Sequence, residues 1–268
     1  MRFQKNCKAE LISKAVMKQF VLCFICLAVF SCQKQYYVNK IEGERLEINR
    51  DLESDSTVDA FIAPYRKHLN ASLDSIISFA PATYSKKDGD LNTAIGNLMA
   101  DAVYQECNPI FKKRYNKTID FVLLNHGGIR AEIPKGPVTL RTAYEVMPFE
   151  NAVVIVGLKA DAILKMVEYL SEVKRAHPLS KQINITFNSS YELEQLTIKG
   201  APLDMDKTYY VATNDYLYNG GDKMVFFKPN EGVFDVDYKI RNVLIDHFKK
   251  IDTLRPKIDD RFIRKVLK

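Results

Sequence analysis

The fold class of this chain follows from one segment, Phe121-Val122-Leu123-Leu124-Asn125-His126-Gly127-Gly128-Ile129-Arg130. Its first four residues form a continuous apolar run, which is typical of a central strand buried on both faces of a sheet. The run then changes abruptly into a polar loop that contains two glycines. Together with the strands and helices predicted around it, the segment favours an α/β (α+β) fold of mixed sheets flanked by helices.

Apolar spacing elsewhere in the chain predicts the elements around this strand. The predicted helices cover residues 58–77, 92–103, 160–173 and 237–250, and Asn92 or Thr93 is expected to cap the second of them. The predicted extended segments are 77–84, 121–124, 151–158, 183–188, 193–199 and 208–213. Strands and helices are mixed along the chain, which favours one domain of this class over a helix bundle or a sandwich.

The 268 residues are 47% hydrophobic and 27% charged, a composition that is ordinary for a globular protein. The formal net charge is +6, but five basic residues and one acid lie within residues 1–32. The rest of the chain is therefore nearly balanced, which excludes the dense basic face of a protein that binds a nucleic-acid polymer.

The N-terminus is similar to a bacterial lipoprotein signal. A basic stretch ends at Lys18, an apolar run covers residues 20–30, and a serine precedes Cys32. The run is too short for an ordinary membrane span. We expect cleavage before Cys32 and lipidation of its thiol, which would place the protein in the cell envelope; an uncleaved anchor helix or plain secretion is the alternative. Met17 competes with Met1 as the true start.

The predicted organisation is a signal peptide over 1–32, a polar tether over 33–56 and one domain over 57–268. Four of the five cysteines, Cys7, Cys23, Cys26 and Cys32, fall within the signal. Only Cys107 remains in the folded part, so neither a disulfide within it nor a cysteine-based zinc site is expected.

A second glycine-containing segment follows another apolar run and reads Asn214-Asp215-Tyr216-Leu217-Tyr218-Asn219-Gly220-Gly221-Asp222. Glycines permit positive φ and a close approach of the backbone to a ligand. An aromatic ring offers a stacking face, and a carboxylate accepts hydrogen bonds from a vicinal diol. These are the parts of a nucleoside pocket, although the segment alone is equally consistent with a surface turn.

Four motifs in this order resemble the C-terminal domain of the 5′-nucleotidase family. They are Ile95–Ala102, Asn125–Arg130, Met147–Phe149 and Asn214–Asp222, and the resemblance runs from about Ile77 to Phe262. In that family this domain supplies the nucleoside-binding half of the active site of a hydrolase of nucleotide catabolism.

The resemblance implies a role for each matching residue. Phe149 and Tyr216 would enclose the base, which Asn125 would also contact. Asp222 would hold the ribose hydroxyls, and Arg130 would reach the ribose or the phosphate. The glycines of both loops would let the backbone approach the substrate: Gly127, Gly128, Gly220 and Gly221.

Each of these residues also has a purely structural interpretation. Phe149 would be core packing, Tyr216 a residue on a helix face, Arg130 a surface ion pair and Asp222 a helix cap. Within the first motif, Asn97 and Asp101 are interpreted as structural hydrogen bonders, and His126 is not assigned a catalytic role.

Two departures from the family pattern bear on the site. Tyr216 stands where phenylalanine is common. Residues 85–92 contain no arginine, although the family usually has one on the phosphate side before the Gly-Asn-Leu sequence. Lys86 or Lys87 is the available substitute, but lysine lacks the planar fork of arginine.

The catalytic half of such an enzyme, a metallophosphoesterase with two metal ions, needs Asp-x-His, Gly-Asn-His followed by an acid, and further histidines. This chain has only His68, His126, His177 and His247, and no Asp-x-His. We expect no catalytic residue, metal site or cofactor in this chain, and divalent metals in a partner catalytic domain.

The sequence therefore favours a lipid-anchored nucleotide-binding domain. It would complete the active site of a separately encoded metallophosphoesterase that hydrolyses nucleotides. A nucleoside-binding lipoprotein for capture or sensing is the alternative. An enzyme with unrecognised chemistry is the weakest hypothesis, because no pairing of nucleophile and base stands out.

Overall fold

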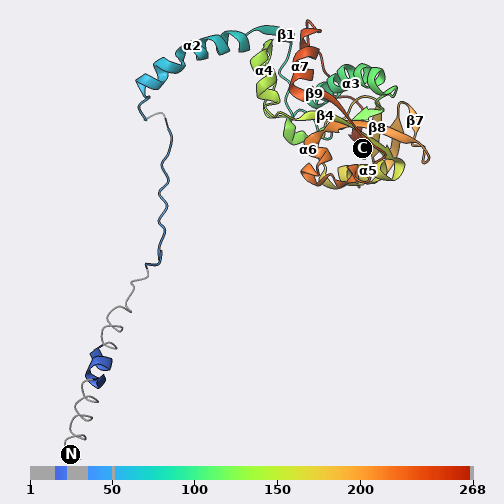
Figure 1. The fold of residues 1–268 in the computed structure, drawn as a ribbon. Coiled ribbons are helices and arrows are strands. Elements are labelled where there is room, and N and C mark those ends of the chain that lie inside the picture. Colours follow the sequence, from blue (N-terminus) through green and yellow to red (C-terminus); the bar gives the residue numbers. More distant parts are fainter. Residues whose placement is uncertain (1–15, 23–35, 50–51, 266–268) are drawn as a thin grey trace, which may run out of the picture. The chain divides into compact units, whose positions relative to one another are not determined.

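The computed structural model describes residues 16–22, 36–49 and 52–265 (Figure 1). The chain divides into two units, Met1–Asp55 and Ser56–Lys268. In the first unit, residues 16–22 are helical and residues 36–49 have no regular structure. Cys32 and residues 23–30 of the predicted apolar run lie outside the described residues. None of the helices described is both long and apolar enough to cross a membrane.

The centre of the second unit is a four-stranded mixed sheet. Its order is β2 (Phe121–Val122), β8 (Thr208–Asn214), β4 (Ala152–Lys159) and β9 (Val233–Lys239). Strands β2 and β8 are parallel, whereas β4 is antiparallel to both β8 and β9. This confirms the predicted mixed sheet.

The apolar run at 121–124 is buried, as predicted, but it does not form the central strand that the sequence indicated. Strand β2 covers only Phe121–Val122 and lies at the end of the strand order, where it pairs with β8 alone within this sheet. Val122 and Leu124 belong to one core cluster, and Phe121 and Leu123 belong to the other. Successive side chains of an extended segment point to opposite faces, so an unbroken apolar run supplies both cores at once.

Helices and a second sheet cover the two faces (Figure 1). Side chains of α3 (Ala94–Tyr115) and α7 (Ile240–Lys249) share the first core cluster. The second cluster joins α5 (Ala160–Val173) to the smaller sheet. That sheet has the order β10 (Phe262–Arg264), β5 (Ile183–Phe187), β6 (Leu193–Ile198), β7 (Ala201–Pro202).

Helix α3 begins where the sequence predicted. The hydroxyl of Thr93 accepts a hydrogen bond from the backbone N–H of Gly96 at 3.2 Å, so Thr93 rather than Asn92 is the cap. The helix continues to Tyr115, well beyond the predicted end at residue 103, and Pro109 lies inside it.

Helix α2 (Ser56–Leu73) ends earlier than predicted, and its regularly spaced apolar side chains are not buried. It ends at Leu73, and strand β1 (Ile76–Ala80) follows and pairs with β3 (Gly136–Thr139). None of its residues is buried, and the side chains of Phe61 and Tyr65 are 71% and 69% exposed. Apolar residues at helical spacing establish the helix but not a packing partner.

The helix predicted over 237–250 was wrong at its start. Residues 237–239 belong to β9, and α7 begins at Ile240. Lys239 pairs with Ala152 of β4, so pairing with the sheet overrides the local helical spacing. The short elements β3, β7, β10 and α4 (Leu140–Val146) were not predicted from the sequence.

Candidate functional site

The two glycine-containing loops lie at the same edge of the central sheet. Strands β2 and β8 pair in parallel, with Phe121 opposite Val211 and Val122 opposite Ala212. Both loops therefore leave from the carboxyl ends of neighbouring parallel strands, which is where open sheets bind ligands. The start of β4 lies there too, because Val153 pairs with Asn214, and this brings the loop that carries Phe149 to the same edge.

A buried amide pair fixes the two loops to each other. The side-chain Nδ2 of Asn214 donates to Oδ1 of Asn125 at 2.9 Å. Oδ1 of Asn214 accepts from the backbone N–H of Leu217 at 2.8 Å and so caps the short helix α6 (Asp215–Tyr218). Asn125 is thus a positioning residue with its oxygen already engaged, and the base contact implied for it stays a prediction.

Tyr216 lies over the double glycine and is tied to Asp222. Its hydroxyl donates to Oδ1 of Asp222 at 2.9 Å and accepts from the backbone N–H of the same residue at 3.3 Å. A Cβ added to Gly221 would lie 2.5 Å from the ring of Tyr216, so only glycine permits this approach. Gly220 has a φ of 90°, which glycine adopts without strain.

The backbone at Asp222 and at Lys223 is also unusual, with φ values of 51° and 62°. Left-handed backbone costs a non-glycine residue of the order of 1 kcal/mol, and such strain is concentrated at ligand sites. Tyr169 of α5 supports the turn, because its hydroxyl donates to the backbone oxygen of Asp222 at 2.8 Å.

Phe149 and Arg130 form the second half of the predicted site. The guanidinium carbon of Arg130 lies 5.8 Å from the centre of the Phe149 ring, within the range of a cation–π contact. Both side chains are exposed, so neither is core packing, and the ring keeps 41% of its surface accessible. Arg241 holds the loop that carries Phe149, because its guanidinium donates to the backbone oxygen of Pro148 at 3.1 Å.

Lys86, not Lys87, lies beside Arg130. Its Nζ donates to the backbone oxygen of Ile129 at 2.8 Å, within the loop that carries Arg130. Burial lowers the pKa of Lys86, and the neighbouring Arg130 lowers it further. The side chain of Lys87 is exposed. Lys86 is therefore the one of the two that can supply positive charge where the family has arginine.

Two histidines lie beneath the first loop. The backbone N–H of His126 donates to Nδ1 of His177 at 3.3 Å, and Nδ1 of His126 contacts the oxygen of Ala176 at 3.2 Å. Burial lowers the pKa of His126 and lowers that of His177 to about 4. Both imidazoles are neutral at pH 7, so the positive charge at this edge comes from lysine and arginine.

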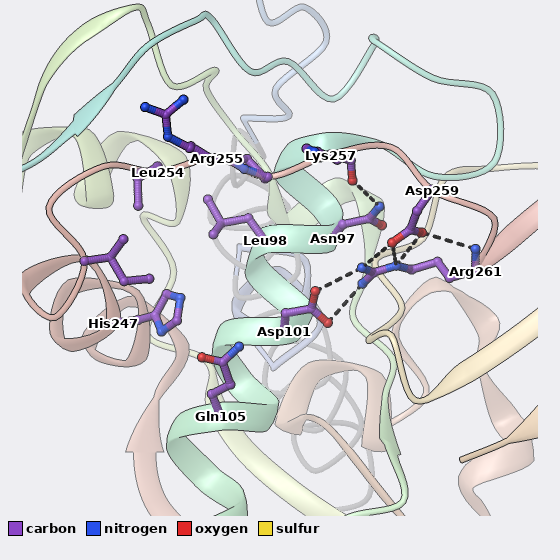
Figure 2. A pocket seen from close by; sticks show the side chains of 12 residues that line it. Asn97, Leu98, Asp101, Gln105, His247, Leu254, Arg255, Lys257, Asp259 and Arg261 are labelled. Carbon is purple, nitrogen blue, oxygen red and sulfur yellow. Dashed lines mark hydrogen bonds and ion pairs between the residues drawn. The ribbon is translucent and has the colours of Figure 1, made fainter. Parts of the chain in front are cut away.

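The first motif, residues 95–102, does not take part in this site. Figure 2 shows Asp101, Asp259 and Arg261 pointing toward one another at the wall of a hollow of about 340 Å³. Arg261 donates to both carboxylate oxygens of Asp101 at 3.0 Å, and Nδ2 of Asn97 donates to Asn92 and to the oxygen of Lys257 at 2.9 Å. Asn97 and Asp101 are structural hydrogen bonders, as the sequence indicated.

Across the described ranges, no group of three or more histidine, cysteine, aspartate or glutamate side chains is arranged to hold a metal ion. The donor set of this part of the chain does not fit the two-metal site of a metallophosphoesterase. No chemical step through a metal is assigned to these residues.

Comparison with known proteins explains this combination of loops. The family model "5′-nucleotidase, C-terminal domain" matches residues 72–229, more than half of the chain. The chain belongs to this family. As a 5′-nucleotidase C-terminal domain, it carries the glycine loops, Phe149 and Asp222 within the matched segment.

Three relatives show how much of a larger protein this domain represents. An apyrase from Tabanus yao is 28% identical over an alignment of 174 residues, and the match covers 58% of this chain and 31% of the apyrase. Cell wall protein Lmo0130 of Listeria monocytogenes is 27% identical over an alignment of 227 residues, and the match covers 69% of this chain and 29% of that protein.

The third is a solved structure, a 5′-nucleotidase precursor from Thermus thermophilus, which superposes with a TM-score of 0.63. It is 24% identical, and the match covers 78% of this chain and 43% of the precursor, so it supports the fold alone. The chain spans less than half the length of all three of these proteins.

Three residues of this 5′-nucleotidase C-terminal domain site carry no assignment from the sequence. Asn214 had a detectable sign, because it follows an apolar run as Asn125 does. Tyr169 and His177 had none, since they reach the site from α5 and the segment after it, which only the tertiary fold brings to the edge of the sheet.

Proposed function

We propose that this chain is the nucleotide-binding part of a 5′-nucleotidase, in which a separately encoded metallophosphoesterase subunit cuts the bound nucleotide. The observation that carries the proposal is the convergence of Arg130 with Phe149 and of Tyr216 with Asp222 at one edge of the central sheet. Accessible aromatic faces stack on a base, a carboxylate accepts from ribose hydroxyls, and a guanidinium suits an oxyanion.

In this proposal the domain binds and orients, and the partner supplies the metal-dependent chemistry. Phe149 and Tyr216 hold the base, Asp222 holds the ribose, and Arg130 with Lys86 faces the phosphate. Support for a partner comes from the donor set of the described residues, which does not fit two metal ions.

The location of the protein is part of the same proposal. The N-terminal sequence indicates an exported lipoprotein anchored through Cys32 in the cell envelope, and one relative is named a cell wall protein. Membrane contact would then be through the lipid alone. Cell fractionation of the wild type and of Cys32→Ser tests this: the variant is expected to leave the membrane fraction, and its retention there would contradict lipid anchoring.

Nucleoside binding is tested by titrating the purified chain with adenosine and uridine monophosphates in a calorimeter. Phe149→Ala is expected to weaken binding by about 1–3 kcal/mol, the value of one base–aromatic stack. Phe79→Ala is the matched control, because Phe79 is 43% exposed, close to the 41% of Phe149, and lies in β1. No binding by the wild type, or equal losses in both variants, would refute the proposed site.

Catalytic assistance is tested by measuring phosphate release with divalent metal, using the chain alone, a metallophosphoesterase from the same genome alone, and both together. The proposal requires release by the mixture to exceed the sum of the separate activities. Binding of nucleotide without such an increase would favour the second candidate, a lipoprotein that captures or senses nucleosides.

A further inference from the structure

A second hollow adjoins the proposed ribose residue and has no role in the function described so far. It has a volume of about 330 Å³ and is lined by Tyr169, Val173, Arg175, His177, Asp222 and Lys223. Asp222 belongs both to this hollow and to the nucleoside site. A ligand whose ribose hydroxyls contact Asp222 would therefore direct a substituent on those hydroxyls into the hollow.

The lining of this hollow is cationic. Arg175 and Lys223 line it, and neither forms an ion pair within the described part of the chain. Asp222 is the only carboxylate in the lining, and its Oδ1 is already engaged by Tyr216. Two cations around one carboxylate leave an excess of positive charge, which attracts an anionic group.

Two structural costs at the hollow also indicate a ligand. Nε2 of His177 is buried and forms no hydrogen bond among the residues described, although an unsatisfied buried polar group costs about 1–3 kcal/mol. Asp222 and Lys223 are held in consecutive left-handed conformations, which turns the backbone at the rim. Both features are destabilising in the free domain, and backbone strain of this kind is concentrated at ligand sites.

The remaining contacts fix the walls of the hollow. Tyr169 donates to the backbone oxygen of Asp222 at 2.8 Å. Lys174, which ends α5 in a left-handed conformation, directs its own ammonium over the ring of Tyr191 at 4.3 Å. Arg175, the next residue, lines the hollow instead. Of these two neighbouring cations, only Arg175 lines the hollow, whereas Lys174 contacts Tyr191.

We propose that the hollow of Arg175, His177 and Lys223 binds a second phosphate of the nucleotide, carried on the 2′ or 3′ oxygen of the ribose. This inference rests on the proposed nucleotide-binding function and narrows its ligand class to nucleotides phosphorylated on the sugar at two positions. Lys86 and Arg130 take the 5′-phosphate, and Arg175 and Lys223 take the other.

The test compares three ligands by calorimetry at 0.1 M salt: a nucleoside 5′-monophosphate and the corresponding 2′,5′- and 3′,5′-bisphosphates, in the adenosine and uridine series. Two exposed charge pairs are worth about a tenfold gain in affinity, so one bisphosphate is expected to bind about tenfold more tightly than the monophosphate. The isomer that shows the gain identifies the oxygen.

The variant Arg175→Gln with Lys223→Gln is expected to reduce that gain to less than twofold and to leave monophosphate affinity unchanged. The matched control, Lys165→Gln with Lys174→Gln, removes the same charge from exposed residues of the α5 region that do not line the hollow. It is expected to keep the gain.

The inference is overturned if the wild type binds monophosphate and bisphosphates equally, if the gain survives in Arg175→Gln with Lys223→Gln, or if the control pair abolishes it. In each of these cases the monophosphate still binds, and the proposed function stands. If none of the nucleotides binds the wild type, the proposed function itself fails and this inference fails with it.

Discussion

Replacing Tyr216 by phenylalanine tests whether this tyrosine acts through its ring alone or also through Asp222. The substitution keeps the aromatic face that would stack on a base. It removes the hydroxyl that donates to Oδ1 of Asp222 at 2.9 Å and accepts from the backbone N–H of the same residue at 3.3 Å. The hydroxyl is thus fully engaged with Asp222 and holds its carboxylate in one orientation.

The contacts of Asp222 determine the expected direction of the effect. A carboxylate has about four acceptor positions, and Oδ1 uses one of them for Tyr216. A ribose diol needs two, which Oδ2 and the remaining lone pair of Oδ1 supply without displacing the tyrosine. The Tyr216 hydroxyl therefore pre-orients Asp222 for the ligand rather than competing with it.

The magnitude follows from the exposure of the pair. A hydrogen bond contributes about 0.5–1.5 kcal/mol, and Tyr216 is 44% exposed, so the lower part of that range applies. We expect Tyr216→Phe to weaken the binding of a ribonucleoside 5′-monophosphate by about 0.7 kcal/mol, or about threefold. Tyr216→Ala is expected to lose a further 1–3 kcal/mol, roughly one stacking contact.

The assay is calorimetric titration with a ribonucleotide and with its 2′,3′-dideoxy analogue. Because the analogue has no diol for Asp222, Tyr216→Phe is expected to leave its affinity unchanged. Tyr218→Phe is the matched control: it removes a hydroxyl two residues away, on a ring that lies beneath the Lys228 ammonium at 4.7 Å. This control is expected to change neither affinity.

Two results would refute the reasoning. Equal weakening of both ligands by Tyr216→Phe would mean that the hydroxyl sets the position of the ring and not the orientation of Asp222. Tighter binding of the ribonucleotide would mean that ribose displaces the tyrosine from the carboxylate, so that the contact inhibits binding.

Further predictions concern stability and reactivity. Burial lowers the pKa of His177 in the folded chain to about 4 from its ordinary 6.5. On acidification the unfolded chain therefore binds a proton at His177 before the folded chain does. The free energy of unfolding should fall by about 2 kcal/mol between pH 7.5 and pH 5 for this reason. Urea unfolding of the wild type and His177→Gln should show that difference, and parallel losses would exclude this cause. Cys107 is fully buried and its pKa is raised to about 12, so a thiol reagent should label it only at the rate of unfolding, and rapid labelling would show an open core. Asp101→Asn should lower the free energy of unfolding by about 2–3 kcal/mol, because Arg261 is buried and keeps only Asp259 as an ion-pair partner, beside its hydrogen bond to the oxygen of Leu179. Nucleotide affinity should stay unchanged, and a loss of stability below about 1 kcal/mol would mean that these remaining contacts suffice.

The sequence predicted the extended run that is apolar on both faces, and it missed a strand that forms by pairing with a neighbouring strand. The run at 121–124 needs no partner to be recognised, because apolar side chains on both faces imply a covered strand. Strand β9 alternates between polar and apolar residues, and it forms because its backbone pairs antiparallel with β4. Helix α2 shows the converse, since its apolar spacing predicted a helix correctly while its side chains remain exposed.

The sequence named candidate site residues where a glycine or an aromatic residue marks a loop after a strand. Phe149, Tyr216 and Asp222 could be named because their loops have a recognisable order. The partners that orient them could not, since Tyr169 and His177 are ordinary residues of a helix and a connection. Lys86 was predicted only in part. The sequence named both Lys86 and Lys87 as substitutes for the missing arginine, and the hydrogen bond from Lys86 to the oxygen of Ile129 favours Lys86.

Most polar side chains at this edge are already held by hydrogen bonds within the domain. The Tyr216 hydroxyl already donates and accepts, the Lys86 ammonium is bound to a backbone oxygen, and His126 and His177 are neutral imidazoles that bond to neighbouring backbone. A general base must be free to take a proton from a reacting group. Tyr216 and Lys86 are already engaged by hydrogen bonds, whereas Nε2 of His177 forms none among the residues described. The hydrogen bonds of Tyr216 and Lys86 hold Asp222 and the backbone before Arg130 in place without a ligand, which lowers the entropy lost on binding.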